Sequence, residues 1–464
     1  MTYRKKYQLG TNMKKADISY VGGILTEYRQ SYEEGLDIKK YEALFRAVGN
    51  MQDEEAQKAV LADTLFEIIA DAPMREDYPF REPSSYEEIC SLRKPHALSS
   101  PKTLTTEILR EKISGAWYGR ICGCILGKPA EGTRFAELKK FLLDAGNYPM
   151  YRYIKRADIH YKSTIRTSCL ADEMMFAPWD DDTNYIVLAQ LLIEKYGRNF
   201  TSKNVLELWL ETQPLSSYFT AEKTALVNYI NGLQPPVSAV FRNPYREWIG
   251  AQIRGDYFGY IHPGDPEAAA ELAFRDASVS HVKNGIYGEM FVAAMLAAAA
   301  VSENREDVIR GGLAQIPATS RLHASVTHLL REYEMGVSQE KVFADIHATW
   351  DDRDNYDWCH TIPNTMIVTA ALLYGKGDFG KTVCMAVETG FDTDCNGATV
   401  GSVLGMMIGE NGISDEWKTP VNGILETTVQ GIGKAPVSEF VDKTMRHILA
   451  VNYAEKNATP FIFD

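Results

Sequence analysis

The sequence predicts an all-α protein, and three observations support this prediction. Its longer apolar segments are rich in Ala, Leu, Ile and Met, with apolar residues at helical spacing. They show little of the period-two alternation that half-buried strands require. Two of them carry a glycine at every fourth position, which places these glycines on one helix face. The expected helices of the main body span residues 183–196, 204–212, 267–275, 285–301, 365–374 and 395–409.

The first 101 residues differ from the rest of the chain. Residues 39–72 have apolar side chains at the spacing of an amphipathic helix. Prolines between 73 and 101 exclude long helices there, so this stretch is predicted to be a linker or an extended segment that wraps the body. We therefore divide the 464-residue chain into an N-terminal extension, residues 1–101, and a compact multi-helix domain, residues 102–464. The prolines are Pro73, Pro79, Pro83, Pro95 and Pro101.

The two glycine series need a physical reason. In SGAWYGRICGCILG the glycines stand at 115, 119, 123 and 127, and in NGATVGSVLGMMIG they stand at 397, 401, 405 and 409. Glycine inside a helix costs about 1 kcal/mol relative to alanine. A smooth glycine face allows close backbone approach, so both helices are expected to be central and tightly packed. Packing of the two on one another is one way to use both faces.

Composition excludes several classes of protein. A net charge of −13 argues against nucleic-acid binding, which normally uses a basic surface. The seven cysteines form no paired CxxC sites and no dense disulfide pattern, as expected of reduced thiols in a cytoplasmic protein. The amino terminus lacks the apolar core of a signal peptide, and the longest apolar run, residues 290–301, is too short to span a bilayer. A soluble, cytoplasmic protein without nucleic-acid or membrane partners is expected.

Two clusters of aspartates each stand at the start of an apolar helix. The first is PWDDDTNYIVLAQ at 178–190 and the second is GFDTDCNGATVG at 390–401. Helix capping explains one acid in each, because an aspartate there accepts hydrogen bonds from free backbone N–H groups. The second cluster imitates the start of an EF-hand loop, but the required glutamate at position twelve is Val403. Each cluster alone therefore fits capping or a solvated loop.

Considered together, the clusters suggest a metal site. Four or five carboxylates in one place would repel one another and raise their pKa values unless cations lay between them. Oxygen ligands with no histidine nearby favour Mg²⁺ or Mn²⁺, and the number of carboxylates suits a site for two ions. On the residues alone, the metal site and simple capping remain equally open.

Three motifs resemble the ADP-ribosylglycohydrolase family, the all-α hydrolases related to dinitrogen-reductase-activating glycohydrolase. GCILGKPAEG at 123–132 resembles the G-D-A-L-G-x-x-x-E stretch of that family, and DDDT at 180–183 resembles its T-D-D-T. GFDTDCNGATVGSVLG at 390–405 resembles its G-x-D-T-D-T segment. The order and separation of the motifs also match, over about residues 110–410. The resemblance implies an ADP-ribosylglycohydrolase-like catalytic domain.

The resemblance also implies roles for individual residues. Glu131 falls on the family glutamate near the metals, and Glu131 and Asp182 are the predicted catalytic residues. Asp180 stands where the family has a threonine ligand, and Cys395 replaces another threonine. The predicted cofactor is a pair of Mg²⁺ ions, with Mn²⁺ as the alternative. The predicted metal ligands are Asp180, Asp181, Asp182, Asp392 and Asp394.

A weaker match covers residues 248–288, which are similar to the family segment that contacts ADP-ribose. Arg254 and His281 are retained, but Trp248 and Ile249 replace a glycine and an asparagine. An indole where a phosphate would meet bare backbone favours a smaller substrate. For the histidines and the asparagine, a buried structural role is as consistent with the sequence as a ligand contact. The candidate substrate contacts are Trp248, Arg254, His281, His360 and Asn364.

The function implied by the resemblance is metal-dependent hydrolysis of an N- or O-glycosidic bond to ribose. The substrate would be an ADP-ribosylated protein or a small ADP-ribosyl or nucleoside-like compound. Two alternatives on the same fold are a module that binds a ribose-containing ligand without turnover and an inert structural protein. Metal content separates the inert protein from the other two, and turnover separates the enzyme from the binding module.

Overall fold

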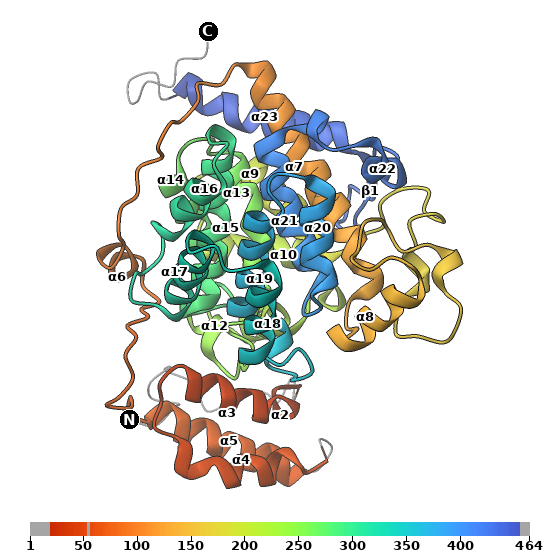
Figure 1. Cartoon of the computed structure of the whole chain (residues 1–464). Helices are drawn as coiled ribbons and strands as arrows, with labels where there is room; N and C mark the ends of the chain where they lie inside the picture. Colours follow the sequence, from red (N-terminus) through yellow and green to blue (C-terminus); the bar gives the residue numbers. More distant parts are fainter. Residues whose placement is uncertain (1–18, 53–55, 455–464) are drawn as a thin grey trace.

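The computed structural model describes residues 19–52 and 56–454, and the fold is all-α as predicted (Figure 1). The N-terminal helices form one layer, and the other helices form a larger body above it. Within the described residues, two three-residue strands form the one small sheet, β1 (Ile424–Glu426) antiparallel to β2 (Lys434–Pro436). The body helices before the second glycine series are α7 (Thr106–Gly127), α8 (Phe135–Asp144), α9 (Asp181–Tyr196), α10 (Ser202–Thr212), α11 (Thr220–Ile230), α12 (Val237–Val240), α13 (Asp256–Tyr260), α14 (Pro266–Ala277), α15 (Lys283–Val301), α16 (Arg305–Leu313), α17 (Arg321–Glu334), α18 (Gln339–Thr349), α19 (Thr361–Tyr374) and α20 (Phe379–Glu388). They are followed by α21 (Thr393–Ile408), α22 (Asp415–Lys418) and α23 (Val437–Ala454).

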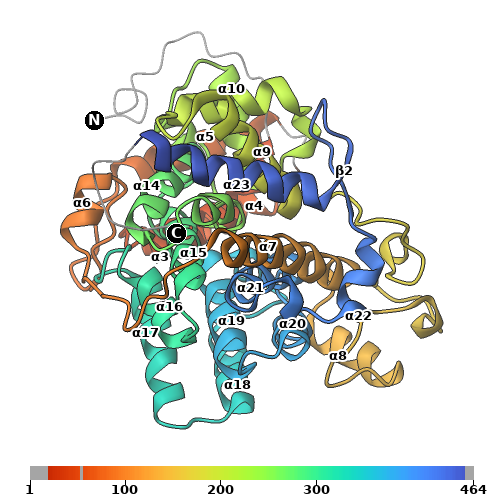
Figure 2. The same cartoon turned by 90° about the horizontal axis from the view of Figure 1, so that it is seen from above.

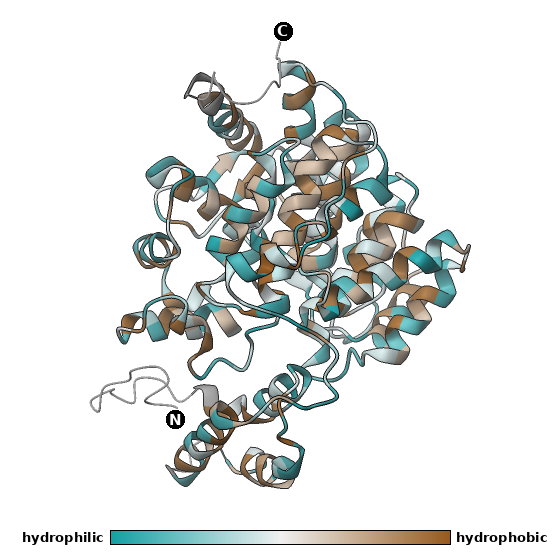
Figure 3. Cartoon of the chain, turned by 90° about the vertical axis from the view of Figure 1, so that its left-hand side faces the viewer, coloured by the Kyte–Doolittle hydropathy of each residue, from teal (hydrophilic) through white to brown (hydrophobic). Residues whose placement is uncertain are grey.

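The N-terminal layer contains more helices than the sequence suggested. The expected helix at 39–72 is divided into a short 3-10 turn, α4 (Glu42–Gly49) and α5 (Ala56–Asp71). Two unpredicted helices, α2 (Ser19–Gly22) and α3 (Ile24–Glu33), precede them. Helix α3 was missed because part of its buried surface is polar: Glu27, Gln30 and Ser31 are all buried. An apolar cluster that includes Ile24 and Phe45 holds the layer together. Figure 3 shows the layer from the side.

Buried charges fix the N-terminal layer to the body. The guanidinium of Arg246 donates to Glu27 and to Glu34, at 2.7 Å in both cases. Gln30 Nε2 donates to Glu247 Oε2 at 2.6 Å. Breaking such a pair leaves an uncompensated buried charge, which typically costs about 3–5 kcal/mol. Buried ion pairs and hydrogen bonds, rather than apolar contacts, therefore hold the polar face of α3 against the body.

The proline-containing stretch is mostly extended and passes along the body towards the start of α7 (Figure 1). Its backbone bonds to distant residues: Arg81 N donates to the Thr319 carbonyl at 3.1 Å, and Lys102 N donates to the Val301 carbonyl at 2.8 Å. One short helix, α6 (Tyr86–Ser91), interrupts it and was not expected. The segment wraps the body, while the domain boundary near residue 101 stays a prediction.

The two glycine-striped helices, α7 and α21, pack directly on one another, as Figure 2 shows from above. A Cβ atom added to Gly119 would lie 2.1 Å from the Gly401 carbonyl oxygen, and one added to Gly123 would lie 1.9 Å from that of Gly397. Real Cβ contacts essentially never fall below 3.0 Å. The glycines therefore exist so that the two backbones can touch, which confirms that both helices are central.

Helix α15 runs through the core of the body and is longer than the apolar run at 290–301, since it begins at Lys283. By length and composition alone it could cross a membrane. Its apolar stretch is completely buried inside the fold, as expected of a core helix.

Candidate active site

The packing of α7 on α21 also brings the two aspartate clusters together. A Cβ atom at Gly127, the last residue of α7, would lie 2.2 Å from the Thr393 carbonyl oxygen at the start of α21. The Thr393 hydroxyl donates to the Gly127 carbonyl at 2.9 Å. Helix α9 starts beside this junction, because Arg120 of α7 binds the backbone carbonyl of Asp182 at 2.9 Å. The starts of α9 and α21 therefore meet at the end of α7.

The acidic side chains converge as the sequence suggested. Ligand atoms of Asp182, Asp394 and Cys395 all lie within 4.8 Å of one another, and so do those of Cys124, Asp180 and Asp182. Asp180 is the N-cap of α9, and its Oδ1 accepts from the backbone N–H of Asp182 at 3.0 Å. Capping thus accounts for one oxygen of Asp180. It does not account for the other carboxylates of the cluster.

Two basic side chains of this region reach the cluster from α7 and its end. Arg120 lies 3.0 Å from Asp182 Oδ1 and 3.0 Å from Asp256 Oδ1, with all three side chains fully buried. The ammonium of Lys128 pairs with Asp180 Oδ2. With all groups ionised, the five clustered aspartates and Asp256 face these two cations, which leaves a formal charge of −4. Two divalent cations would neutralise this charge.

The pKa values reflect the crowding. Burial and the neighbouring aspartates raise the pKa of Asp182 well above its usual range, although Arg120 opposes this effect. Burial and the charges of Glu131 and the other aspartates raise the pKa of Asp394 in the same way. Burial also acts to raise the pKa of Asp180, but Lys128 outweighs it, so this pKa is lowered. Asp392 has its pKa raised to about 6, by burial first and by Glu131 second.

The donor set fits divalent cations. Asp182 Oδ2 and Asp394 Oδ1 are buried and have no hydrogen-bond partner among the described residues. An unpartnered buried carboxylate oxygen is costly unless a cation contacts it. The carboxylates that could hold cations are Asp180, Asp181, Asp182, Asp392 and Asp394.

Glu131 is a partly exposed carboxylate at the end of the turn that follows α7. This 3-10 turn spans Lys128–Ala130, and Glu131 pairs with the guanidinium of Arg166. The backbone N–H of Arg166 donates to the Pro129 carbonyl at 2.7 Å, which fixes the pair next to the turn. The charge of Glu131 contributes to the raised pKa values of Asp392 and Asp394, so it acts electrostatically on both.

Asn364 is attached to the acidic cluster. Its Oδ1 accepts from the backbone N–H of Asp392 at 3.3 Å and from Asn396 Nδ2 at 2.7 Å. In the 3-10 turn before α19, the Cys359 thiol donates to Asp392 Oδ2 at 3.3 Å. Asn364 and Cys359 thus orient Asp392 from the start of α19. The role of Asn364 in substrate binding stays a prediction.

Trp248 and His360 lie on adjacent backbone segments that form an antiparallel bridge. The Trp248 side chain is only 5% exposed and packs edge-on against Tyr245, and its Nε1 has no partner among the described residues. His360 caps α19 through Nδ1, stacks on Trp350, and leaves Nε2 3.8 Å from Glu247 Oε2. The indole therefore lies in the interior rather than on a solvent-facing loop.

His281 and Arg254 are also buried. His281 Nδ1 shares a hydrogen bond with the Ser280 hydroxyl at 2.8 Å, while burial and the charge of Arg254 lower its pKa well below the usual range. Arg254 is paired with Asp276, Glu222 at 2.8 Å and Glu289 at 3.5 Å. Three carboxylates already pair with this guanidinium. Its contact with a substrate stays a prediction. In this structure it stabilises the loop after Trp248.

The sequence reasoning missed most of the groups that control the acidic cluster. Arg120 and Lys128 are among these groups, and the sequence analysis gave neither a role in the site. A basic residue inside a glycine-striped core helix was the available signal, because a buried charge needs a buried partner. No sequence pattern pointed to Asp256, Cys359 or Arg166.

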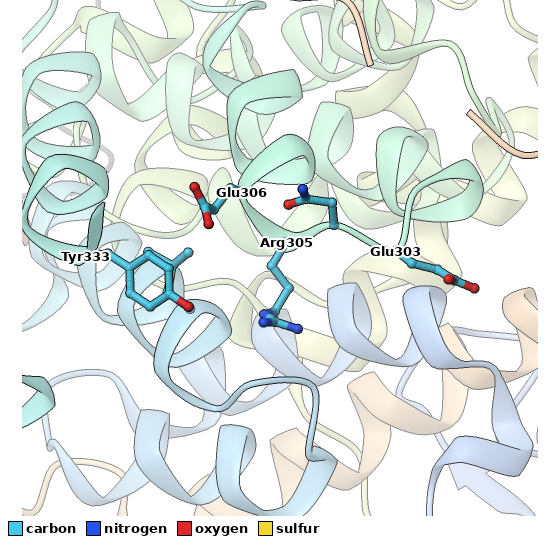
Figure 4. A pocket seen from close by; sticks show the side chains of 6 residues that line it. Glu303, Arg305, Glu306 and Tyr333 are labelled. Carbon is cyan, nitrogen blue, oxygen red and sulfur yellow. The ribbon is translucent and has the colours of Figure 1, made fainter. Parts of the chain in front are cut away.

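A separate pocket of about 440 Å³ lies at the start of α16 (Figure 4). Glu303, Arg305, Glu306 and Tyr333 line it, together with Asn304 and Leu373. None of the predicted site residues belongs to this pocket, and Leu373 is the one fully buried residue of its lining, whose charged side chains are not buried. The acidic cluster is therefore the better candidate for a reaction centre.

Comparison with known proteins identifies the family of the chain. The family model described as ADP-ribosylglycohydrolase matches residues 105–447. A solved structure described as an ADP-ribosylglycohydrolase-related protein complex is 16% identical, and the similarity covers 74% of this chain and 99% of that one with a TM-score of 0.46. No curated protein matches the chain.

Proposed function

This chain belongs to the ADP-ribosylglycohydrolase family, a family of hydrolases, and from that premise we propose that it cleaves a glycosidic bond to ribose at the acidic cluster. The proposed cofactor is a pair of Mg²⁺ ions, with Mn²⁺ as the alternative. The observation that carries the proposal is the meeting of two aspartate clusters around unpartnered buried oxygens. Carboxylates arranged only for capping would have no reason to be brought together in this way.

Each protein group has a distinct task in this proposal. Divalent cations would polarise substrate oxygens and supply an activated water at the site. Asp182 would hold a cation through Oδ2, because Arg120 already fixes Oδ1 at 3.0 Å. Glu131 would move the proton, as a general base towards the attacking water or a general acid towards the leaving group. Arg166 orients the Glu131 carboxylate before substrate arrives.

We propose a small ribosyl compound as the substrate, in preference to an ADP-ribosylated protein. The support is the buried indole of Trp248 and the complete pairing of Arg254 with carboxylates, which leave this segment without a free group for phosphates. The net charge of −13 disfavours large anionic partners. The seven free cysteines are consistent with a reducing, cytoplasmic location, which remains part of the proposal.

An NMR assay of ribosylated compounds with Mg²⁺ tests the reaction directly. We expect release of free ribose or ADP-ribose from at least one compound, and loss of this release when a chelator removes the cation. Binding without product release would replace the enzyme with a ribose-binding module on the same fold. Absence of both cation uptake and ligand binding would leave only a structural role.

Competition binding tests the size of the substrate. With Mg²⁺ present, we expect at least one nucleoside to bind the wild-type protein more tightly than ADP-ribose does. Trp248→Gly is expected to gain affinity for ADP-ribose, because removing the indole makes room for a phosphate beside the main chain. Trp248→Phe is the comparison variant, since it keeps an aromatic side chain but removes the indole N–H and only part of the ring volume, so we expect it to gain less affinity than Trp248→Gly.

Two results would contradict the small-substrate proposal. One is ADP-ribose binding to wild type at least about tenfold more tightly than any nucleoside, a difference of roughly 1.4 kcal/mol. The other is a folded Trp248→Gly protein with no gain of ADP-ribose affinity, which would mean that the bulk of the indole does not exclude the phosphates. Thermal melting must accompany these measurements, because truncating a buried Trp typically costs about 3–5 kcal/mol.

A further inference from the structure

One group of candidate metal ligands in the acidic cluster consists of two carboxylates and a thiol. Ligand atoms of Asp182, Asp394 and Cys395 lie within 4.8 Å of one another, and all three residues are buried. Asp182 comes from the first turn of α9, and the other two come from the first turn of α21. Because two helices position them, the three side chains form a preorganised set.

Unpartnered atoms in this set point to a missing cation. Asp182 Oδ2 and Asp394 Oδ1 have no hydrogen-bond partner within the described part of the chain, although Asp182 is fully buried and Asp394 is 3% exposed. Arg120 reaches only the other oxygen of Asp182. A buried carboxylate oxygen without a hydrogen-bond partner is costly, and binding a metal ion removes this cost.

The neighbouring set of Cys124, Asp180 and Asp182 has one basic neighbour more: Arg120 pairs with Asp182, which both sets share, and Lys128 also pairs with Asp180. Lys128 pairs with Asp180 Oδ2, while Asp180 Oδ1 accepts from the backbone N–H of Asp182. Both oxygens of Asp180 are thus engaged. A metal ion beside Cys124 would be repelled by the ammonium of Lys128, whereas the set with Cys395 has no ammonium in contact.

We propose that Cys395 binds a metal ion as a thiolate together with Asp182 and Asp394, so that this position prefers Zn²⁺, Fe²⁺ or Co²⁺ over Mg²⁺. The inference rests on the proposed function and changes one of its two ions: the position beside Cys395 takes the softer metal, and the other position keeps Mg²⁺ or Mn²⁺. Thiolate ligands favour these softer ions, whereas sites made only of carboxylates favour Mg²⁺ and Mn²⁺. Three protein ligands with one open position is also the usual arrangement of catalytic zinc.

The binding step is balanced in protons and charge. The S–H bond of Cys395 breaks, its electron pair forms the sulfur–metal bond, and the proton leaves to the solvent. The metal keeps its oxidation state, and no further reactant is needed. The remaining coordination position stays open to water or to a substrate oxygen.

Cobalt spectroscopy tests the thiolate without any assay of activity. Metal-stripped full-length protein titrated with Co²⁺ is expected to show a thiolate-to-cobalt charge-transfer band in the near ultraviolet. The band should disappear in Cys395→Ser and persist in Cys124→Ser. Cys384→Ser is the control for a buried thiol of α20 outside the acidic cluster, and it should also keep the band.

Calorimetry of the same proteins measures how the affinities for Zn²⁺ and Mg²⁺ change. Cys395→Ser is expected to lose at least about tenfold in Zn²⁺ affinity, about 1.4 kcal/mol, while its Mg²⁺ affinity is maintained or increased. Cys395→Thr provides a second hydroxyl variant, and melting curves show which of the two remains folded.

The outcomes distinguish this inference from the proposed function. Cobalt uptake without the band, or a band that survives in Cys395→Ser and Cys395→Thr, overturns thiolate ligation and leaves an oxygen-only metal site. If only Cys124→Ser loses the band, the thiolate ligand is Cys124 and not Cys395, which also overturns the inference. Failure to take up any divalent ion contradicts both this inference and the metal-dependent mechanism.

Discussion

Gly119→Leu and Gly401→Leu are each expected to destabilise the protein by more than about 3 kcal/mol, the upper end of ordinary overpacking. The new side chain would begin with a Cβ atom about 2.1–2.2 Å from a carbonyl oxygen of the facing helix. A backbone atom cannot rotate away as a side chain can, so α7 and α21 must separate. Chemical denaturation and thermal melting measure the effect, which is large relative to a total stability of about 5–15 kcal/mol.

The alanine variants give the sharper version of this test. Alanine is intrinsically better than glycine in a helix by about 1 kcal/mol, so Gly→Ala would stabilise an unconstrained position. We expect Gly119→Ala and Gly401→Ala to destabilise instead. Ile108→Leu is the control in the same helix, because Ile108 is 46% exposed and should tolerate the exchange. Unchanged melting of both glycine variants would contradict direct backbone packing.

Asp394→Asn and Glu131→Gln should both lose hydrolysis, for different reasons. Asp394→Asn removes a charged ligand, so we expect loss of at least one bound cation and of measurable turnover. Glu131→Gln removes only the proton-transfer group and is expected to lower turnover by roughly 10²–10⁴ while cation binding persists. Calorimetry and the NMR assay, performed on the same samples, separate the two effects.

Melting with and without Mg²⁺ gives an independent measure of the metal site. A cation at 100 times its dissociation constant stabilises the folded protein by about 2.7 kcal/mol. Asp394→Asn should lose part or all of this gain and, without metal, should be no less stable than wild type, since it removes an unpartnered buried charge. Asp415→Asn is the control, because the Asp415 side chain is 97% exposed. Equal metal-induced stabilisation of wild type and Asp394→Asn would contradict our assignment of this ligand.

The elements best predicted from the sequence were those whose signal is local. Helices α9, α14 and α21 begin within two residues of their expected starts, because apolar periodicity and an N-terminal acid act within a few turns. The glycine series predicted close packing for the same reason, since a four-residue repeat fixes one helix face. Helix α3 was missed because its buried face contains Glu27 and Gln30, whose partners Arg246 and Glu247 lie more than 200 residues away.

The candidate site divides in the same way. Sequence motifs were sufficient to select Glu131 and the five aspartates, because each motif is contiguous and its order along the chain is a property of the sequence. They could not show that Lys128 neutralises Asp180, that Arg120 joins Asp182 to Asp256, or that Cys359 contacts Asp392. These contacts join different helices, and no local pattern specifies which partner a buried charge will meet.

The sequence by itself determined the helical class, the glycine faces and the identity of the acidic groups, since these depend on residue type and spacing. Only the tertiary structure decided that Trp248 is buried, that Arg254 is engaged by three carboxylates, and that Cys395 lies beside two unpartnered oxygens. The physical reason is that desolvation and charge compensation depend on every group within a few ångströms. That neighbourhood is assembled by the contact between α7 and α21 and by the elements packed around it.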